Sequence, residues 1–303
     1  MYNLIKLIAP AKVNLVLAVG DKRSDGFHSV DTIMHALSLH DTLTMRRFEE
    51  DEGGLTVSLT CETAGAIPEL DVEPGENIVS RAIVMLADEL DRACDEHFEV
   101  QLQKSIPAEA GLGGGSSDAA AALIGASMFW EVDPTSEPVL RVASRLGADV
   151  PFFLHGGCVR LTGKGEEHAG SLEPRRGFVL LLRPDAGVST KAAYAAFDAS
   201  PEPPSDTLLA ELARHTAAES VVPWNNLERA ACTVTPEVAE VLAWGRALPG
   251  GDDVVLCGSG SAVCVMFPSY DEACQASIEA HKQGWWARVT SFSPLGASVL
   301  KAL

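Results

Sequence analysis

A run of glycines lies directly against a run of strong helix formers in residues 107–123, PAEAGLGGGSSDAAAAL. The four glycines within 111–115 can adopt positive φ angles, which turn successive N–H groups toward one point, and they let a ligand approach the backbone. The alanines that follow predict a firm helix, capped by Ser116 or Ser117, with Asp118 in its first turn. The positive end of this helix then faces the loop, so the segment predicts an anion site, and phosphate is the natural anion.

The alternative for this segment is that its glycines only shape a turn. Several glycines beside two serines cost much backbone entropy on folding, so we favour the phosphate site. The loop lacks the lysine of the GxxxxGK[ST] motif and does not complete GxGxxG. The GKG sequence at 163–165 is not a P-loop, because Cys158 stands where the first glycine of that motif is required.

The net charge of the chain limits its partners. It is −19 at pH 7, with an isoelectric point near 4.7. A field of that sign repels nucleic acids and anionic membranes, so neither is expected as a partner, and nothing in the sequence sets an oligomeric state. A phosphate site must therefore be built from backbone N–H groups, a helix terminus, a bound cation and a few placed lysines.

Length and cysteine usage indicate a cytoplasmic enzyme of two modest domains within 303 residues. No apolar run reaches membrane-spanning length. The apolar N-terminus is interrupted at Lys6, Pro10, Lys12 and Asn14, and no cleavage site follows, so no signal peptide is expected. The seven cysteines form no CxxC pair, which favours reduced thiols over disulfides or a zinc site.

Hydrophobic periodicity predicts mixed strands and helices. The expected strands are 4–9 and 12–19, separated at Pro10, then 35–48, 55–60, 98–104, 178–184, two within 253–267, and 285–292. The expected helices are 78–90 with Asn77 as cap, the helix after the glycine loop to about 130, 136–146, 190–198, 207–215, 225–232, 236–248 and 270–283. Regular βαβ alternation is missing, so the fold class is α+β rather than a doubly wound sheet, with a domain boundary near residue 163.

Seven further motifs accompany the glycine loop in one order: APAKVNLVL, DGFHSVDTIM, LGADVPFFLHGG, GVSTKAAYAAF, NNLE, CGSGSAVCVMF and SFSPLG. With GLGGGSSDAAAAL they resemble the GHMP kinases. This resemblance implies a two-domain GHMP kinase fold, with an N-terminal domain (1–163) like the second domain of ribosomal protein S5 and a ferredoxin-like C-terminal domain (164–303). Within the superfamily, the motifs are most similar to ATP-dependent kinases that phosphorylate the 2-hydroxyl of a cytidine diphosphate ester of methylerythritol, in non-mevalonate isoprenoid precursor biosynthesis.

Two other classes of protein remain open. Another small-molecule kinase of the superfamily would share the loop and Asp149 but lack the residues that hold cytosine. A non-catalytic nucleotide-binding or RNA-binding protein is also possible, since S5-like domains occur in RNA binders. The net charge of −19 and the presence of both Lys12 and Asp149 argue against this second class.

Asp149 and Lys12 are the candidate catalytic residues. Asp149 lies in the apolar stretch GADVPFF, where an unpaired buried carboxylate would be costly. The resemblance implies that it is the base, or the electrostatic partner, of the attacking hydroxyl. It also places the ammonium of Lys12 beside that carboxylate, where it would lower the pKa of the substrate hydroxyl. In phosphoryl transfer, positioning and the metal supply most of the catalysis, so full proton abstraction is not required.

The resemblance also implies that ATP lies over the glycine loop with Mg²⁺ bridging its phosphates. The implied nucleotide contacts are Pro107, Gly111, Leu112, Gly113, Gly114, Gly115, Ser116, Ser117, Asn77 and Lys104. Ser117 is the candidate Mg²⁺ ligand, and no acidic metal ligand is evident. Helix capping explains Asn77 almost as well as nucleotide binding does.

The substrate implied by the resemblance is a small cytidine diphosphate molecule, which lies in a cleft between the domains. Phe27 and Phe197 would stack on the two faces of cytosine, and His28 would read its edge. The family usually has Tyr at the position of Phe27, so stacking is kept and a phenol hydrogen bond is lost. Asn14 would contact the polyol or a phosphate. The backbone at a second glycine turn would close the substrate end, at Gly258 and Gly260, although a hairpin turn explains these glycines too.

Overall fold

The computed structural model describes residues 3–64, 67, 75–92, 95–249 and 253–303, and these form two sheets. The strands of the first sheet are β1 (Leu4–Lys22), β2 (His28–Glu49), β3 (Leu55–Thr63), β4 (Glu96–Lys104), β5 (Cys158–Thr162), β6 (Glu167–Leu172), β8 (Trp224–Asn225) and β12 (Ser298–Ala302). Five of them follow the order β12-β1-β2-β4-β3, while β5 pairs with β2, β6 with β5 and β8 with β1.

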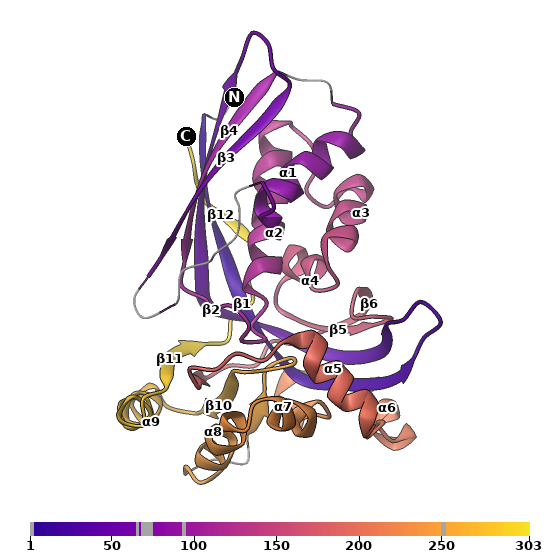
Figure 1. The fold of residues 1–303 in the computed structure, drawn as a ribbon, viewed down its shortest axis with the longest axis vertical. Coiled ribbons are helices and arrows are strands. Elements are labelled where there is room, and N and C mark those ends of the chain that lie inside the picture. The colour runs from indigo at the N-terminus through magenta and orange to yellow at the C-terminus, as the bar shows by residue number, and fades with distance from the viewer. Residues whose placement is uncertain (1–2, 65–66, 68–74, 93–94, 250–252) are drawn as a thin grey trace.

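Four helices cover one face of the first sheet (Figure 1). They are α1 (Ile78–Glu89), α2 (Gly114–Phe129), α3 (Glu137–Leu146) and α4 (Val150–His155). Helix α2 lies closest to the sheet, and its alanines at 119–122 are fully buried. A side chain at Gly125 would overlap the sulfur of Met45 on β2, so the small residues of α2 are what allow this close packing.

The second sheet lies at the lower end of the molecule in Figure 1 and has the order β11-β7-β10-β9. Its strands are β7 (Phe178–Arg183), β9 (Val254–Leu256), β10 (Val263–Phe267) and β11 (Trp286–Ser291). The helices of this part are α5 (Thr190–Ala199), α6 (Asp206–Leu212), α7 (Glu228–Val234), α8 (Glu237–Arg246) and α9 (Tyr270–Lys282), with a 3₁₀ turn η1 (Ala218–Ser220). Strands β9 and β10 are buried throughout, which explains their unbroken apolar sequences.

The end of the chain returns to the first sheet, which the sequence pattern does not predict. Strand β12 pairs antiparallel with β1, with Ile5 opposite Ala302, so the first and last described strands lie side by side (Figure 1). Strand β6, which begins at Glu167, also belongs to the first sheet. The boundary near residue 163 stays a prediction.

The predicted break at Pro10 is wrong, because β1 continues through it. The pairing of β1 with β2 instead shifts register between Pro10 and Lys12. Proline has no N–H to give to a ladder, so an irregularity at this point leaves the strand intact. The N–H of Lys12 then donates to the carbonyl of Leu112 at 2.9 Å, which ties β1 to the glycine loop.

The predicted serine cap of the glycine-loop helix is also wrong. Helix α2 begins at Gly114, and Gly113 is its N-cap with a φ of 72°. Ser116 and Ser117 therefore lie inside the first turn. A left-handed N-cap is accessible to glycine at little cost, so the loop turns into the helix earlier than a serine cap would allow.

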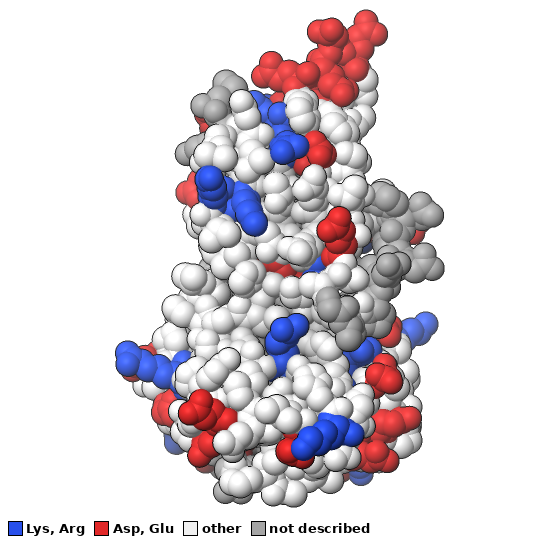
Figure 2. Space-filling model, turned by 90° about the vertical axis from the view of Figure 1, so that its left-hand side faces the viewer, with Lys and Arg blue, Asp and Glu red and all other residues white. Residues whose placement is uncertain are grey.

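No helix in the described ranges is long and apolar enough to cross a membrane. Six cysteines in those ranges are unpaired, and Cys94 lies outside them. On the face drawn in Figure 2, Lys and Arg side chains are scattered among acidic ones. Acidic side chains gather at the end farthest from the second sheet. This face therefore offers no continuous positive surface, in keeping with the net charge.

Candidate active site

The glycine loop and the turn between β9 and β10 bind each other through their backbones. The N–H of Ser261 donates to the carbonyl of Glu109, and that of Ala262 donates to the carbonyl of Ala110, both at 3.1 Å. A side chain at Gly111, whose φ is 73°, would overlap the carbonyl oxygen of Cys257. Glycine is therefore required at 111 for contact between the two sheets, whether or not a ligand is bound.

Lys12 and Asp149 meet beside this junction. The ammonium of Lys12 lies 3.5 Å from a carboxylate oxygen of Asp149. A Cβ at Gly113 would lie 3.0 Å from Cγ of Lys12, and one at Gly258 would lie 3.3 Å from its Nζ. The Lys12 side chain is 4% exposed and that of Asp149 30%, so the carboxylate is the member of the pair that a ligand can reach. The structure thus brings together four predicted site residues from distant parts of the chain.

Asn14 positions the ammonium of Lys12. Its Oδ1 accepts a hydrogen bond from Lys12 Nζ at 2.6 Å, and its Nδ2 donates to the hydroxyl of Thr32 at 2.8 Å. Thr32 in turn donates to the carbonyl of Val16 at 2.6 Å, so the chain of bonds ends on the backbone of β1. Both ends of the Asn14 amide bond within the protein, which supports a positioning role more than the predicted contact with substrate.

Lys104 lies directly beneath the glycine loop in a buried ionic cluster. Its ammonium donates to Asp41 and, at 2.6 Å, to Asp118. Asp41 also accepts from the N–H groups of Ser105 and Ile106 at the start of the loop. The cluster therefore fixes the chain between β4 and α2, and both bonds of Lys104 are to protein carboxylates rather than open to a nucleotide.

Burial and charge act on this cluster in opposite directions. Burial opposes the charge of Lys104, but Asp118 and Asp41 outweigh it and raise the pKa of Lys104 to about 12. Burial raises the pKa of Asp118 from 3.8 to about 8, against the lowering effect of Lys104. Of the two carboxyl groups that share Lys104, Asp118 is therefore one that holds a proton more readily than an ordinary aspartate does.

We expect Asp41→Asn to lower the free energy of unfolding by about 3 kcal/mol, because it breaks a buried ion pair. Asp118→Asn should cost less than about 1 kcal/mol, because an amide resembles the protonated acid.

The folded protein keeps a proton on Asp118 that the unfolded chain loses, so this group lowers stability as pH rises from about 4 to about 8. Asp118→Asn should flatten that slope, measured by urea unfolding across pH; equal losses from both variants would contradict this arrangement.

The other residues predicted to contact ATP lie around the start of α2. Asn77 caps α1, its side chain accepting from the N–H of Val79 at 3.0 Å, as the capping alternative predicted. A Cβ at Gly115 would have Ile78 as its nearest neighbour, at 3.9 Å, so the cap lies beside the exposed part of the loop. Pro107 and Leu112 are buried and shape the loop from below. The hydroxyl of Ser116 lies 3.9 Å from where a Cβ at Gly147 would be, just before α4 begins.

Ser117, the predicted Mg²⁺ ligand, lies in the first turn of α2. No group of three or more His, Cys, Asp and Glu side chains in the region that the structure describes could hold a metal ion. The hydroxyl of Ser117 is buried and has no hydrogen-bond partner among the described residues. Mg²⁺ commonly takes one or two protein ligands and completes its shell with substrate phosphates and water. The residues present therefore fit a Mg²⁺ that arrives with a nucleotide, and they do not form a protein cage for the ion.

The residues predicted to hold the pyrimidine base, Phe27, His28 and Phe197, lie where the β1–β2 hairpin approaches α5. Phe27 is 59% exposed, and the ammonium of Lys164 lies 5.0 Å from its ring centroid. The ring of His28 is buried, 5.2 Å from that of Tyr194 and 6.0 Å, edge-on, from that of Phe197. Phe197 is only 3% exposed and packs in the core with Leu17, Val19, Val30 and Leu227.

Tyr194 is a candidate site residue that the sequence analysis missed. Its ring packs on His28, and burial together with the charge of Asp149 raises the pKa of its phenol to about 12. Tyr194 therefore lies between His28, which is predicted to bind cytosine, and the Lys12–Asp149 pair. The motif GVSTKAAYAAF contains both aromatic residues, and nothing in its spacing shows which of them faces the core.

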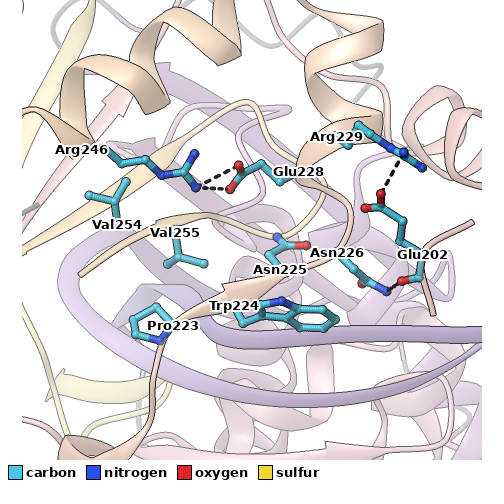
Figure 3. A pocket seen from close by; sticks show the side chains of 10 residues that line it. All are labelled: Glu202, Pro223, Trp224, Asn225, Asn226, Glu228, Arg229, Arg246, Val254 and Val255. Carbon is cyan, nitrogen blue, oxygen red and sulfur yellow. Dashed lines mark hydrogen bonds and ion pairs between the residues drawn. The ribbon is translucent and has the colours of Figure 1, made fainter. Parts of the chain in front are cut away.

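A pocket of about 320 Å³ lies next to this site (Figure 3). It is lined by Glu202, Pro223, Trp224, Asn225, Asn226, Glu228, Arg229, Arg246, Val254 and Val255. Arg246 is paired with Glu228 and Arg229 with Glu202, so the two guanidinium groups already have carboxylate partners. Asn225 donates to the carbonyl of Gly258 at 2.7 Å and thereby holds the second glycine turn in place.

Comparison with known proteins first gives the class. Residues 77–157, which contain the glycine loop, match the family model of the GHMP kinases N terminal domain. A crystal structure of homoserine kinase from Cytophaga hutchinsonii superposes with a TM-score of 0.71 at 18% identity, covering 99% of this chain and 98% of that one. Such a likeness concerns the fold alone, and it confirms the predicted α+β GHMP kinase fold.

Closer relatives then give the family. A 4-diphosphocytidyl-2-C-methyl-D-erythritol kinase of Salinispora tropica is 37% identical over 84% of this chain and 81% of its own length. The corresponding kinase of Mycobacterium tuberculosis is 33% identical over 97% and 92%. A crystal structure of 4-(cytidine 5'-diphospho)-2C-methyl-D-erythritol kinase matches with a TM-score of 0.73 at 31% identity, over 95% of this chain and 99% of that one.

The chain therefore belongs to the 4-diphosphocytidyl-2-C-methyl-D-erythritol kinase family of GHMP kinases. It is a phosphotransferase with an alcohol group as acceptor, which confirms the resemblance seen in the sequence motifs. The alternative of another small-molecule GHMP kinase is the less favoured one, since the named relatives cover most of the chain.

Proposed function

We propose that this enzyme transfers the γ-phosphoryl group of ATP to the 2-hydroxyl of 4-diphosphocytidyl-2-C-methyl-D-erythritol, a step of non-mevalonate isoprenoid precursor biosynthesis. The observation that carries the proposal is the Lys12–Asp149 pair, 3.5 Å apart, beside a glycine loop that opens a helix. A hydroxyl bound next to Asp149 faces a phosphate bound at that loop. Positioning of this kind is the main protein contribution to phosphoryl transfer.

In this reaction the substrate hydroxyl attacks the γ-phosphorus. A new P–O bond forms, the bond from phosphorus to the β–γ bridging oxygen breaks, and ADP leaves. Asp149 accepts the proton that the hydroxyl loses, or hydrogen-bonds it as the new bond forms. The ammonium of Lys12, held by Asn14, stabilises the negative charge that develops on the attacking oxygen.

The nucleotide phosphates bind at the N-terminus of α2 in this proposal. The first N–H groups of a helix have no intrahelical acceptor, and here Ser117 is the first to bond back, to the carbonyl of Gly113 at 2.9 Å. The N–H groups of Gly114, Gly115 and Ser116 then point to the loop and favour an anion. A Mg²⁺ held by Ser117 and the phosphates would neutralise negative charge on the transferred group.

For the cytidine end, we propose that Tyr194 takes the stacking role assigned above to Phe197. Phe27 is exposed at the hairpin and Tyr194 is partly exposed on α5, whereas the ring of Phe197 is enclosed by core residues. Cytosine would lie between Phe27 and Tyr194, with His28 at its edge. Gly258 and Gly260 would close the far end of the substrate through their backbones.

Competition by cytidine nucleotides tests the substrate class. CMP and CDP should compete with the polyol substrate and not with ATP, because they bind at the proposed cytosine site and do not reach the glycine loop. UMP and UDP should compete more weakly. If CDP competed with ATP and not with the polyol substrate, the assignments of the cytosine site and the ATP site would have to be exchanged.

Tyr194→Leu is expected to raise the KM for the cytidine substrate by at least about tenfold, because base–aromatic stacking contributes about 1–3 kcal/mol. Phe197→Leu should instead lower the melting temperature and leave that KM within about threefold, because its ring packs in the core. Steady-state kinetics and thermal unfolding of both variants provide the measurement. A large rise in KM for the Phe197 variant alone would restore the original assignment.

A further inference from the structure

Asp198 connects the base-reading histidine to two separate elements. Its Oδ1 lies 2.7 Å from Nε2 of His28, which begins β2, and its Oδ2 accepts from Nζ of Lys22 at the end of β1, at 2.8 Å. Asp198 itself lies on α5, one residue after Phe197. The β1–β2 hairpin curves toward α5 in Figure 1, and Asp198 fixes it there.

The carboxylate determines which nitrogen of His28 carries the proton. An ionised carboxylate only accepts hydrogen bonds, so the nitrogen that faces it must be Nε2–H. Hydrogen bonds from Lys22 and His28 hold the pKa of Asp198 below its usual range, which keeps it in this accepting form. In the neutral imidazole the other nitrogen, Nδ1, then carries a lone pair and accepts.

Nδ1 is available for a ligand. The His28 residue is 8% exposed, and no residue in the described part of the chain hydrogen-bonds to Nδ1. The rings of Tyr194 and Phe197 lie against the imidazole, and within the described part of the chain the Tyr194 hydroxyl makes no hydrogen bond to Nδ1. A buried ring with one nitrogen fixed by a carboxylate and the other without a partner is poised to receive a single hydrogen bond from a donor.

We propose that Asp198 is a positioning residue that holds His28 in the Nε2–H tautomer, so that Nδ1 accepts from the 4-amino group of cytosine and disfavours the 4-oxo group of uracil. Cytosine presents a donor at this position, whereas uracil presents an acceptor. Two acceptors facing each other leave both unpaired, which is costly in a buried site. This inference rests on the proposed function, since it concerns how the enzyme selects its nucleoside.

Asp198→Asn is the test variant. Its amide keeps the size of the side chain but can donate to Nε2, which frees the ring to adopt the Nδ1–H tautomer. We expect the ratio of kcat/KM for the cytidine substrate to that for its uridine analogue to fall about tenfold, through KM. At saturating substrate kcat should be retained, since Lys12 and Asp149 are unchanged.

Lys22→Met is the matched control. It removes the other partner of Asp198 but leaves the carboxylate on His28, so the cytidine/uridine ratio should stay as in the wild type. If Lys22→Met lowers the ratio as much as Asp198→Asn does, the interaction only anchors the hairpin and the proposal is wrong.

The tautomer itself can be read without any substrate. Nitrogen-15 NMR of ring-labelled histidine should show His28 protonated at Nε2 and not at Nδ1 in the wild type, and should show that preference lost in Asp198→Asn. A ring protonated at Nδ1 or at both nitrogens in the wild type would overturn the proposal. If the wild type fails to phosphorylate the cytidine substrate, the proposed function fails instead, and the NMR result still reports on Asp198.

Discussion

Asp149→Asn is expected to lower turnover at least about a hundredfold, the usual scale for a positioned proton acceptor. The amide keeps the shape of the side chain but cannot accept the hydroxyl proton as a carboxylate does. Affinity for ATP should change less than about twofold, because Asp149 pairs with Lys12 and, in the described part of the chain, no hydrogen bond or ion pair joins its side chain to the glycine loop. Single-turnover kinetics, with ATP binding measured by calorimetry, separate the two effects.

The control for this variant is Asp271→Asn. Asp271 is exposed in the first turn of α9, far along the chain from the site, so the same change of charge should leave turnover as it is. Near-normal turnover in Asp149→Asn would rule out its assigned role. A hundredfold loss that came with lost ATP affinity or a lower melting temperature would point to disturbed structure rather than chemistry.

Gly115→Val is expected to weaken ATP binding at least about tenfold in a folded protein. Gly115 is exposed in the first turn of α2, and an added Cβ would meet nothing closer than Ile78 at 3.9 Å. The free protein therefore has room for the side chain, which would stand where phosphate must approach the N–H groups. Calorimetry with a non-hydrolysable ATP analogue gives the affinity.

The choice of Gly115 avoids two uninformative variants. A side chain at Gly113, whose φ is 72°, would lie 2.7 Å from the ring of Phe153, and one at Gly114 would lie 3.2 Å from Nζ of Lys104, so both would disturb the fold. Gly170→Val is the matched control, because nothing lies within 4 Å of a Cβ there. Unchanged ATP affinity in Gly115→Val, with the control also unchanged, would mean that the loop is only a turn.

Local patterns were sufficient to predict the elements whose signals lie within one segment. The helical spacing after Asn77 predicted α1 and its cap, and the alanine run predicted α2. The apolar run at 178–184 predicted β7. These elements are set by periodicity and propensity, which a short stretch of sequence contains in full.

Other features depend on contacts between distant segments, which periodicity does not contain. The pairing of β12 with β1 joins the two ends of the chain. Strand β1 passes through Pro10 because a register shift beside β2 accommodates it. No local signal distinguishes a strand with such an irregularity from two separate strands.

The sequence motifs predicted which segments form the site. They did not predict which residue of each motif faces the ligand and which one supports it from within the protein. Lys12 and Asp149 come together as expected, yet Asn14 supports Lys12 from within the protein. Tyr194 and Phe197 are three residues apart on α5, and only tertiary packing decides which of them is enclosed. Ionic partners such as those of Lys104 are likewise set by the fold.

The most direct test of the proposed kinase reaction is the release of ADP from ATP with the purified protein, with and without 4-diphosphocytidyl-2-C-methyl-D-erythritol. We expect ADP to appear only when this substrate is present, in equal amounts with a new phosphate monoester on the polyol, seen by phosphorus NMR. Mevalonate and homoserine should give no ADP above background. Release of ADP without the cytidine substrate, or equally fast with mevalonate or homoserine, would contradict the proposed function.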